Sequence, residues 1–134
     1  MNSPYTDSEA RALIAKIYAA DEAMNTMAFV DLLSPDAVFQ LGRSPVMTGR
    51  DSIQGFVQGL FSSLAGLRHR LIHFWVGNGK LVFQGEVTFK LPTGQSLLLP
   101  YVDVVTPGDG GLLEDYRIYI DLTPMHPGAK TPSP

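Results

Sequence analysis

The sequence contains no cysteine, no excess of basic residues and no long apolar run. Without cysteine there can be no disulfide, no thiolate metal site and no cysteine nucleophile. The net charge is -3, and Lys and Arg are scattered along the chain, so nothing suggests binding to nucleic acid or to an anionic membrane. We therefore expect the partner to be a small molecule or another protein.

No apolar stretch approaches the length needed to span a membrane. The first residues, Met1–Asp7, also lack the basic patch and apolar stretch of a secretory leader. The sequence thus predicts a cytoplasmic protein without membrane association. With 134 residues, 45% of them apolar, the chain has the size of one ordinary domain. We expect a single domain over residues 1–122 and a Pro-rich, flexible tail over residues 123–134.

Helical patterns dominate the first half of the chain. Thr6 and Glu9 form a capping-box pattern, and apolar residues follow it at helical spacing. A second helical pattern stops before Pro35, because the residue preceding proline disfavours helical backbone. Asp51 can cap a third helix, which Gly66 ends. The patterns predict helices at residues 7–24, 27–33 and 51–65, and a short strand at 37–41.

Strand patterns dominate the second half. From Leu67 onward the hydrophobic period changes to that of strands, and three Gly-containing turn signals divide the segment. This predicts a four-strand antiparallel meander. Two-residue turns at Asn78–Gly79 and Thr93–Gly94, with the last turn centred on Asp109–Gly110, would set its register.

This register gathers polar groups on one face of the sheet. Three cross-strand rows share that face: His73, Gln84, Asp103 and Tyr116; Leu71, Glu86, Tyr101 and Ile118; and His69, Thr88, Leu99 and Ile120. The opposite face, which includes Phe74, Val102 and Val104, is almost wholly apolar in this register. An apolar outer face predicts a homodimer.

Asp103 is the most informative residue in the chain, because it interrupts the apolar run Leu97–Val105. Burying an ionised carboxylate without partners is costly, so such a group is hydrogen-bonded, protonated or next to a wet cavity. We expect Asp103 to be an acid or base in a pocket. The alternative is a carboxylate that is bonded to Tyr116 for structure alone.

Several motifs together resemble a known superfamily. They are the helix and strand order, the Gly49–Arg50 turn after Ser44–Met47, and Asp103–Val105 followed by a Gly-rich turn and Tyr116–Asp121. This pattern is similar to that of the nuclear transport factor two superfamily, which includes ketosteroid isomerases, limonene-epoxide hydrolases, scytalone dehydratases and SnoaL-like polyketide cyclases. The resemblance covers about residues 7–122. It implies an α+β fold in which a cone-shaped, curled antiparallel sheet packs on three N-terminal helices, encloses an apolar pocket and dimerises through its outer face.

The resemblance carries over to only some functional positions. Asp103 matches the oxyanion-hole aspartate of ketosteroid isomerases, which an apolar site keeps protonated. Tyr18 lies within a residue of their helix tyrosine, but Leu41 stands near their general-base aspartate and cannot accept a proton. Glu86 lies near one aspartate of the limonene-epoxide hydrolase triad, whose arginine and second aspartate have no counterpart here.

We therefore expect an enzyme that needs no cofactor and moves protons on a hydrophobic, oxygen-bearing small molecule, such as a polyketide, terpenoid or steroid-like compound. Isomerisation, cyclisation and dehydration all fit such chemistry. The predicted catalytic residues are Asp103, Glu86, His73 and Tyr116. The predicted substrate-binding residues are Tyr18, Trp75, Gln84, Thr88, Leu99, Tyr101, Ile118 and Ile120. An epoxide hydrolase and a non-catalytic binding or assembly module are the alternatives.

Each candidate also has a purely structural interpretation. A register error of one residue would place Glu86 on the other face. A lone histidine on a strand, such as His73, is more often a satisfied structural residue, and His69, between two arginines, is expected to face solvent. No metal site is expected, because these two histidines lie about 13 Å apart along a strand.

Overall fold

The computed structural model describes residues 5–125, in which six strands form one curled, unclosed sheet. The sheet order is β2–β1–β6–β5–β4–β3. The strands are β1 (Leu33–Leu41), β2 (Met47–Thr48), β3 (Gly66–Gly77), β4 (Lys80–Lys90), β5 (Ser96–Pro107) and β6 (Leu113–Ile120). Strands β3 to β6 form the predicted antiparallel meander. The sheet as a whole is mixed, because β1 runs parallel to β6.

Three α-helices precede the meander: α1 (Asp7–Glu22), α2 (Thr26–Val30) and α3 (Arg50–Ser62). The predicted capping box begins α1, since the Thr6 hydroxyl accepts from the Glu9 N–H (3.2 Å) and the Glu9 carboxylate accepts from the Thr6 N–H (2.9 Å). Helix α2 is shorter than predicted, because β1 begins at Leu33. Helix α3 follows Gly49, whose φ of 92° favours glycine.

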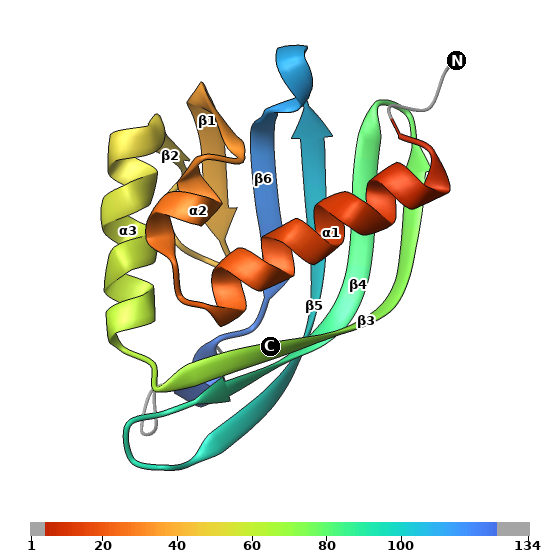
Figure 1. Ribbon diagram of the computed structural model, residues 1–134. Helices are drawn as coiled ribbons and strands as arrows, with labels where there is room; N and C mark the ends of the chain where they lie inside the picture. The colour runs from red at the N-terminus through yellow and green to blue at the C-terminus, as the bar shows by residue number, and fades with distance from the viewer. Residues whose placement is uncertain (1–4, 126–134) are drawn as a thin grey trace.

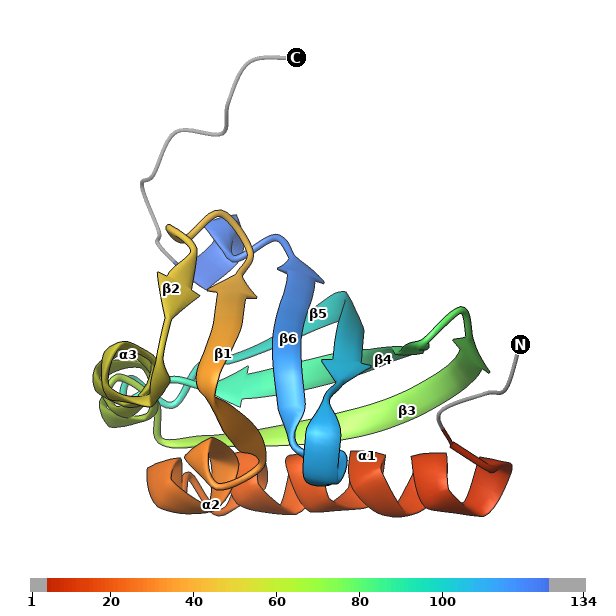
Figure 2. The ribbon, with the colours of Figure 1, turned by 90° about the horizontal axis from the view of Figure 1, so that it is seen from above.

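The helices lie together on one side of the sheet (Figure 1). Helix α1 crosses the sheet and packs against β3, α3 packs against β1 and β2, and α2 contacts both other helices. Seen from above, the long strands β3 and β4 sweep across toward α1, so the sheet curls around the helix side (Figure 2). The predicted α+β fold, a curled sheet covered by three helices, is confirmed.

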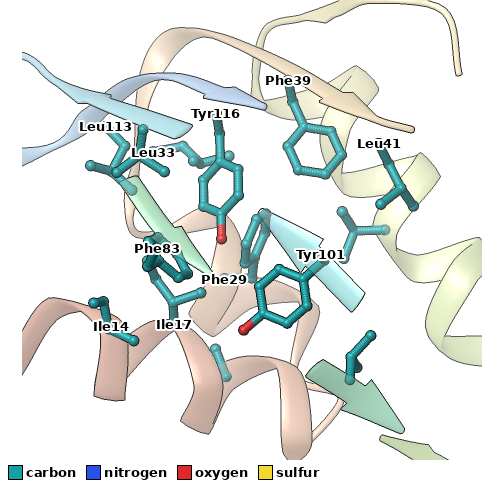
Figure 3. Close-up of a cluster of buried hydrophobic side chains, with 14 of the residues drawn as sticks. Ile14, Ile17, Phe29, Leu33, Phe39, Leu41, Phe83, Tyr101, Leu113 and Tyr116 are labelled. Carbon is teal, nitrogen blue, oxygen red and sulfur yellow. The ribbon is translucent and has the colours of Figure 1, made fainter. Parts of the chain in front are cut away.

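The core fills the space between the helices and the concave face of the sheet (Figure 3). Ile14 and Ile17 on α1 are fully buried, as the apolar stripe of this helix predicts. An aromatic group packs opposite them, with the ring of Phe29 5.8 Å from Phe39 and 5.5 Å from Tyr116. Each large buried apolar side chain of this kind contributes about 1.5–3 kcal/mol.

Two 3-10 turns complete the described chain: η1 (Asp109–Gly111) and η2 (Thr123–Met125). The predicted tail therefore begins with a short turn, and its remaining residues, 126–134, lie outside the described residues. Within residues 5–125 no helix combines the length and the hydropathy needed to cross a membrane.

The register between β4 and β5 differs by one residue from the prediction. The turn has three residues, Pro92–Thr93–Gly94, and Gly94 has a φ of 91°. The Leu91 N–H donates to the Gln95 carbonyl across it (2.8 Å). Gln84 consequently lies opposite Val102 instead of Asp103. Because side chains alternate along a strand, this shift moves one whole set of β4 side chains to the other face.

A bulge in β3 changes its register as well. Leu71 pairs with Gly85 and His73 pairs with Gln84, so Ile72 is the extra residue. His69 and Leu71 therefore face the helices, whereas Ile72 and His73 are both exposed. The predicted face that joined His69 to His73 does not exist.

Candidate active site

A cavity of about 60 Å³ lies between the concave face of the sheet and the helices. Four phenylalanine rings contribute to its walls: Phe29, Phe39, Phe61 and Phe89. Four side chains with ionisable groups also line it: Asp21, His69, Tyr101 and Asp103. The other lining residues are aliphatic, so these four groups supply the polar chemistry of the cavity.

Asp103 lies on β5 and is almost completely buried, with 5% exposure. The Tyr116 hydroxyl donates to Oδ2 at 2.7 Å, while Oδ1 is buried without a hydrogen-bond partner among the described residues. Burial raises the pKa of Asp103 to about 8, although the Tyr116 hydrogen bond opposes this shift. The carboxyl is therefore mostly protonated at neutral pH. Since Oδ2 accepts from Tyr116, Oδ1 is the atom left to donate a proton.

Two more tyrosines meet beside this carboxyl. The hydroxyl of Tyr18 on α1 contacts the hydroxyl of Tyr101 on β5. Burial raises the pKa of Tyr18 to about 12, and burial also raises the pKa of Tyr101, so both phenols stay protonated. In Figure 3 the hydroxyls of Tyr101 and Tyr116 both point toward the helix side of the core.

Gly85 on β4 makes room for Tyr101, which lies opposite it in the sheet. A Cβ at Gly85 would be 2.6 Å from the Tyr101 hydroxyl and 2.5 Å from the Arg70 carbonyl oxygen. Only glycine therefore fits at this position with Tyr101 in its present place.

His69 on β3 is held on several sides. Its ring stacks on Tyr18, with centroids 4.4 Å apart and an interplanar angle of 7°. Nδ1 is 3.3 Å from the Glu22 carboxylate, and Nε2 is 3.9 Å from the Asp21 carboxyl. Burial lowers the pKa of His69, while the hydrogen bond to Glu22 opposes the shift. The imidazole is therefore mostly neutral at pH 7 and can accept a proton.

Asp21 on α1 brings a second carboxyl to the cavity. Its side chain is 16% exposed. Burial raises the pKa of Asp21 well above its ordinary value, and the neighbouring carboxyl groups of Asp103 and Glu22 raise it further. The cavity thus combines two carboxyls that favour the protonated form with one neutral imidazole.

Several predicted site residues do gather here. Asp103, Tyr101, Ile118 and Ile120 line the cavity. The Tyr116 hydroxyl donates to Asp103, and the Tyr18 hydroxyl contacts the hydroxyl of the cavity residue Tyr101. Leu99 is buried on the same strand as Asp103 and Tyr101.

The other predicted site residues lie on the outer face of the sheet and do not line this cavity. They are Glu86, His73, Trp75, Gln84 and Thr88. Glu86 pairs with Arg70, and the His73 ring packs at 4.6 Å against Trp75, which is 50% exposed. The three-residue loop between β4 and β5 places Gln84, Glu86 and Thr88 on the outer face. The bulge in β3 separates His73 from the inward-facing His69.

Asp21 was not predicted as a site residue, and His69 was expected to face solvent. Asp21 could have been found, because it lies four residues after Ile17 and three after Tyr18 and so continues the buried stripe of α1. An acid at such a position signals a polar site within the core. The predicted cross-strand rows placed His69 on the face of Asp103, but its position between two arginines favoured a solvated residue.

Within residues 5–125 no group of three or more His, Asp or Glu side chains is arranged to hold a metal ion.

The profile of the SnoaL-like domain matches residues 14–115, which include the cavity residues Asp21, His69 and Asp103. The chain belongs to the SnoaL-like domain family. No curated protein matches this SnoaL-like chain.

Solved structures show the same fold. A protein from Jannaschia sp. CCS1, provisionally assigned as a SnoaL-like polyketide cyclase, aligns with a TM-score of 0.77 at 17% identity over 99% of each chain. An NTF2-like protein of unknown function from Burkholderia pseudomallei K96243 aligns with a TM-score of 0.75 at 17% identity over 87% of this chain and 93% of its own. SalBIII, an epoxide hydrolase/cyclase-like enzyme of pyran ring formation in salinomycin, aligns with a TM-score of 0.74 at 14% identity over 87% of this chain and 94% of its own. The family match confirms the predicted SnoaL-like family, and these structures show the fold that was predicted with it.

Proposed function

We propose that this SnoaL-like protein is a cofactor-independent acid/base enzyme that acts on a neutral, hydrophobic, oxygen-bearing small molecule. The observation that carries the proposal is the buried carboxyl of Asp103, whose Oδ1 lacks a partner among the described residues while the neutral imidazole of His69 lines the same cavity. An acid and a base in one water-poor space are the two groups that proton transfer requires.

Asp103 is the proposed acid. Its protonated carboxyl can donate to a carbonyl or epoxide oxygen of the ligand and stabilise negative charge that develops there. The Tyr116 hydroxyl holds Oδ2 and so orients the carboxyl. The position near which ketosteroid isomerases place their base is Leu41, which lines the cavity but cannot accept a proton.

His69 is the proposed base. Nε2 would take a proton from the carbon next to the ligand carbonyl. The C–H electron pair would form the C=C bond of an enol, and the C=O π pair would move to the oxygen, which receives the Asp103 proton. Return of a proton to another carbon gives isomerisation. Loss of a hydroxyl as water gives dehydration, and attack by the enol carbon on a second carbonyl gives cyclisation. In each outcome His69 and Asp103 take up and supply the protons, and the bonds that form and break lie within the ligand.

The cavity residues also favour a ligand class. No Lys or Arg is among the described residues that line the cavity, so an anionic ligand would have no counter-charge there. At about 60 Å³ the cavity has room for roughly five water-sized molecules. We therefore expect a larger ligand to insert its oxygen-bearing end among the Phe side chains, while the rest stays near the entrance or displaces mobile side chains.

The proposal is tested by incubating the protein with a panel of neutral ketones, hydroxyketones and epoxides and following products by mass spectrometry. We expect Asp103→Asn to lose turnover and still bind the same compounds, with the exposed Asp36→Asn as control. Compounds that bind to the wild-type cavity, as seen by NMR shift changes, but are never altered would instead support the binding-module alternative.

We also propose a homodimer through the outer face of the sheet. Trp75, Leu98 and Tyr119 lie on that face and are 50%, 61% and 62% exposed. Polar residues such as Gln84 and Glu86 lie among them, so this face is less apolar than the sequence predicted. Large exposed aromatic side chains of this kind are common in interfaces between protein chains.

A further inference from the structure

We propose that Glu22, which lies beside His69 with its side chain one-third exposed, is a positioning residue that keeps the His69 proton on Nδ1 and leaves Nε2 free as the base. This inference rests on the proposed function, because it explains how His69 could serve as a base in this cavity.

The contacts of a single carboxylate oxygen carry the inference. Oε2 of Glu22 accepts from the backbone N–H of His69 at 2.8 Å and lies 3.3 Å from its ring Nδ1. A carboxylate only accepts hydrogen bonds, so Nδ1 must carry the hydrogen in this contact. Since a neutral imidazole has one N–H, Nε2 keeps its lone pair.

The ring is also held against rotation, which could otherwise exchange the two nitrogens. Tyr18 stacks on one face at 4.4 Å, and Tyr101 meets the ring edge-on with centroids 5.8 Å apart. Successive residues of a helix are about 100° apart around its axis. Asp21 and Glu22 at the end of α1 can therefore lie near different nitrogens of one ring, with Nε2 on the Asp21 side that lines the cavity.

The charge of Glu22 has a second effect on the base. The titratable groups around the ring are Tyr18, Asp21 and Glu22 from α1 and Tyr101 from β5. Burial disfavours the imidazolium and lowers the pKa of His69, whereas the Glu22 charge and hydrogen bond oppose this shift. When Nε2 takes a proton from the ligand, Glu22 would stabilise the resulting positive charge, as an acidic partner does for a catalytic histidine.

The test measures the His69 ring nitrogens directly, by long-range ¹H–¹⁵N NMR of the full chain from pH 5 to pH 8, with His69→Gln to assign the signals. We expect the wild-type ring to be protonated on Nδ1. Glu22→Gln keeps an acceptor but loses the charge, so the pKa of His69 should fall while the tautomer is retained. Glu22→Ala loses both, so the proton should move to Nε2.

Glu86→Gln is the matched control, because Glu86 pairs with the neighbouring Arg70 on the outer face. It should change neither the tautomer nor the pKa of His69. A wild-type ring protonated on Nε2, or Glu22 variants that leave both properties unchanged, would overturn the inference. These measurements need no substrate, so they are independent of the proposed function. With a substrate in hand, Glu22→Gln should also shift the acidic limb of the kcat/KM profile to lower pH, which a merely structural residue would not do.

Discussion

The free energy of unfolding should fall between pH 5 and pH 7 because of Asp103. Replacing Asp103 with asparagine should remove this part of the pH dependence. Asparagine has nearly the same shape as a protonated aspartic acid, and its carbonyl oxygen can still accept from the Tyr116 hydroxyl, as Oδ2 does now. The substitution therefore removes the titration of the buried group while it keeps the packing and the hydrogen bond.

The magnitude follows from the shifted pKa. In the folded protein the Asp103 carboxyl stays protonated up to a pKa of about 8, whereas in the unfolded chain it ionises above about 3.9. The contribution of this carboxyl to the stability of the fold is fully present below the unfolded-state pKa. It is lost as the pH rises toward the folded-state pKa, because between the two values only the folded state still binds the proton. Each pH unit in this window lowers the free energy of unfolding by about 1.4 kcal/mol, which gives about 3 kcal/mol between pH 5 and pH 7.

The assay is urea unfolding of the wild type and Asp103→Asn at pH 5, 6 and 7. Asp21 also favours its protonated form in the folded state and adds a change of the same sign, and His69 adds one of the opposite sign. Both are present in the two proteins, so the difference between the curves isolates Asp103. The exposed Asp36→Asn should follow the wild type. Parallel curves for the wild type and Asp103→Asn would show that Asp103 is already ionised at pH 5 and would refute the reasoning.

Three further changes test other parts of the structure. Tyr116→Phe removes the hydrogen bond that favours the ionised carboxyl, so carboxyl-carbon NMR should show a higher pKa for Asp103; an unchanged value would mean that the bond is weak. Gly85→Ala places a Cβ against the Arg70 carbonyl and the Tyr101 hydroxyl, and urea unfolding should show a loss of about 1–3 kcal/mol; full stability would mean that the β4 backbone moves easily there. Trp75→Glu should convert a dimer at micromolar concentration into a monomer in sedimentation experiments, and a wild-type protein that is already monomeric would contradict the proposed interface.

Local signals predicted most of the fold. The capping box and the apolar stripe of α1 act within a few residues of one another, and the Gly-containing turns divide the meander at the observed places. Asp103 and Tyr116 were placed on the same face although the β5–β6 register is displaced by two residues from the prediction. An even displacement keeps the same set of side chains on each face.

The β3 and β4 part of the site could not be predicted, because it depends on odd displacements. The Thr93–Gly94 pair fits a two-residue turn as well as the observed three-residue turn that begins at Pro92. The bulge at Ile72 has no local sequence mark. The extra residue in the turn sent Glu86 and His73 to the outer face and brought Gly85 inward, and the bulge at Ile72 kept His69 on the inner face.

The surface turn at Pro92–Thr93–Gly94 thus controls which chemistry the interior receives. Shortening it to two residues while keeping the strands paired would bring the alternate side chains of β4 inward and replace Phe83, Gly85 and Val87 with Gln84, Glu86 and Thr88. In a fold of this kind, an insertion or deletion far from the ligand can alter an active site more completely than a substitution within it. Evolution could therefore obtain new reactions from loop length, at positions that alignments usually treat as variable and unimportant.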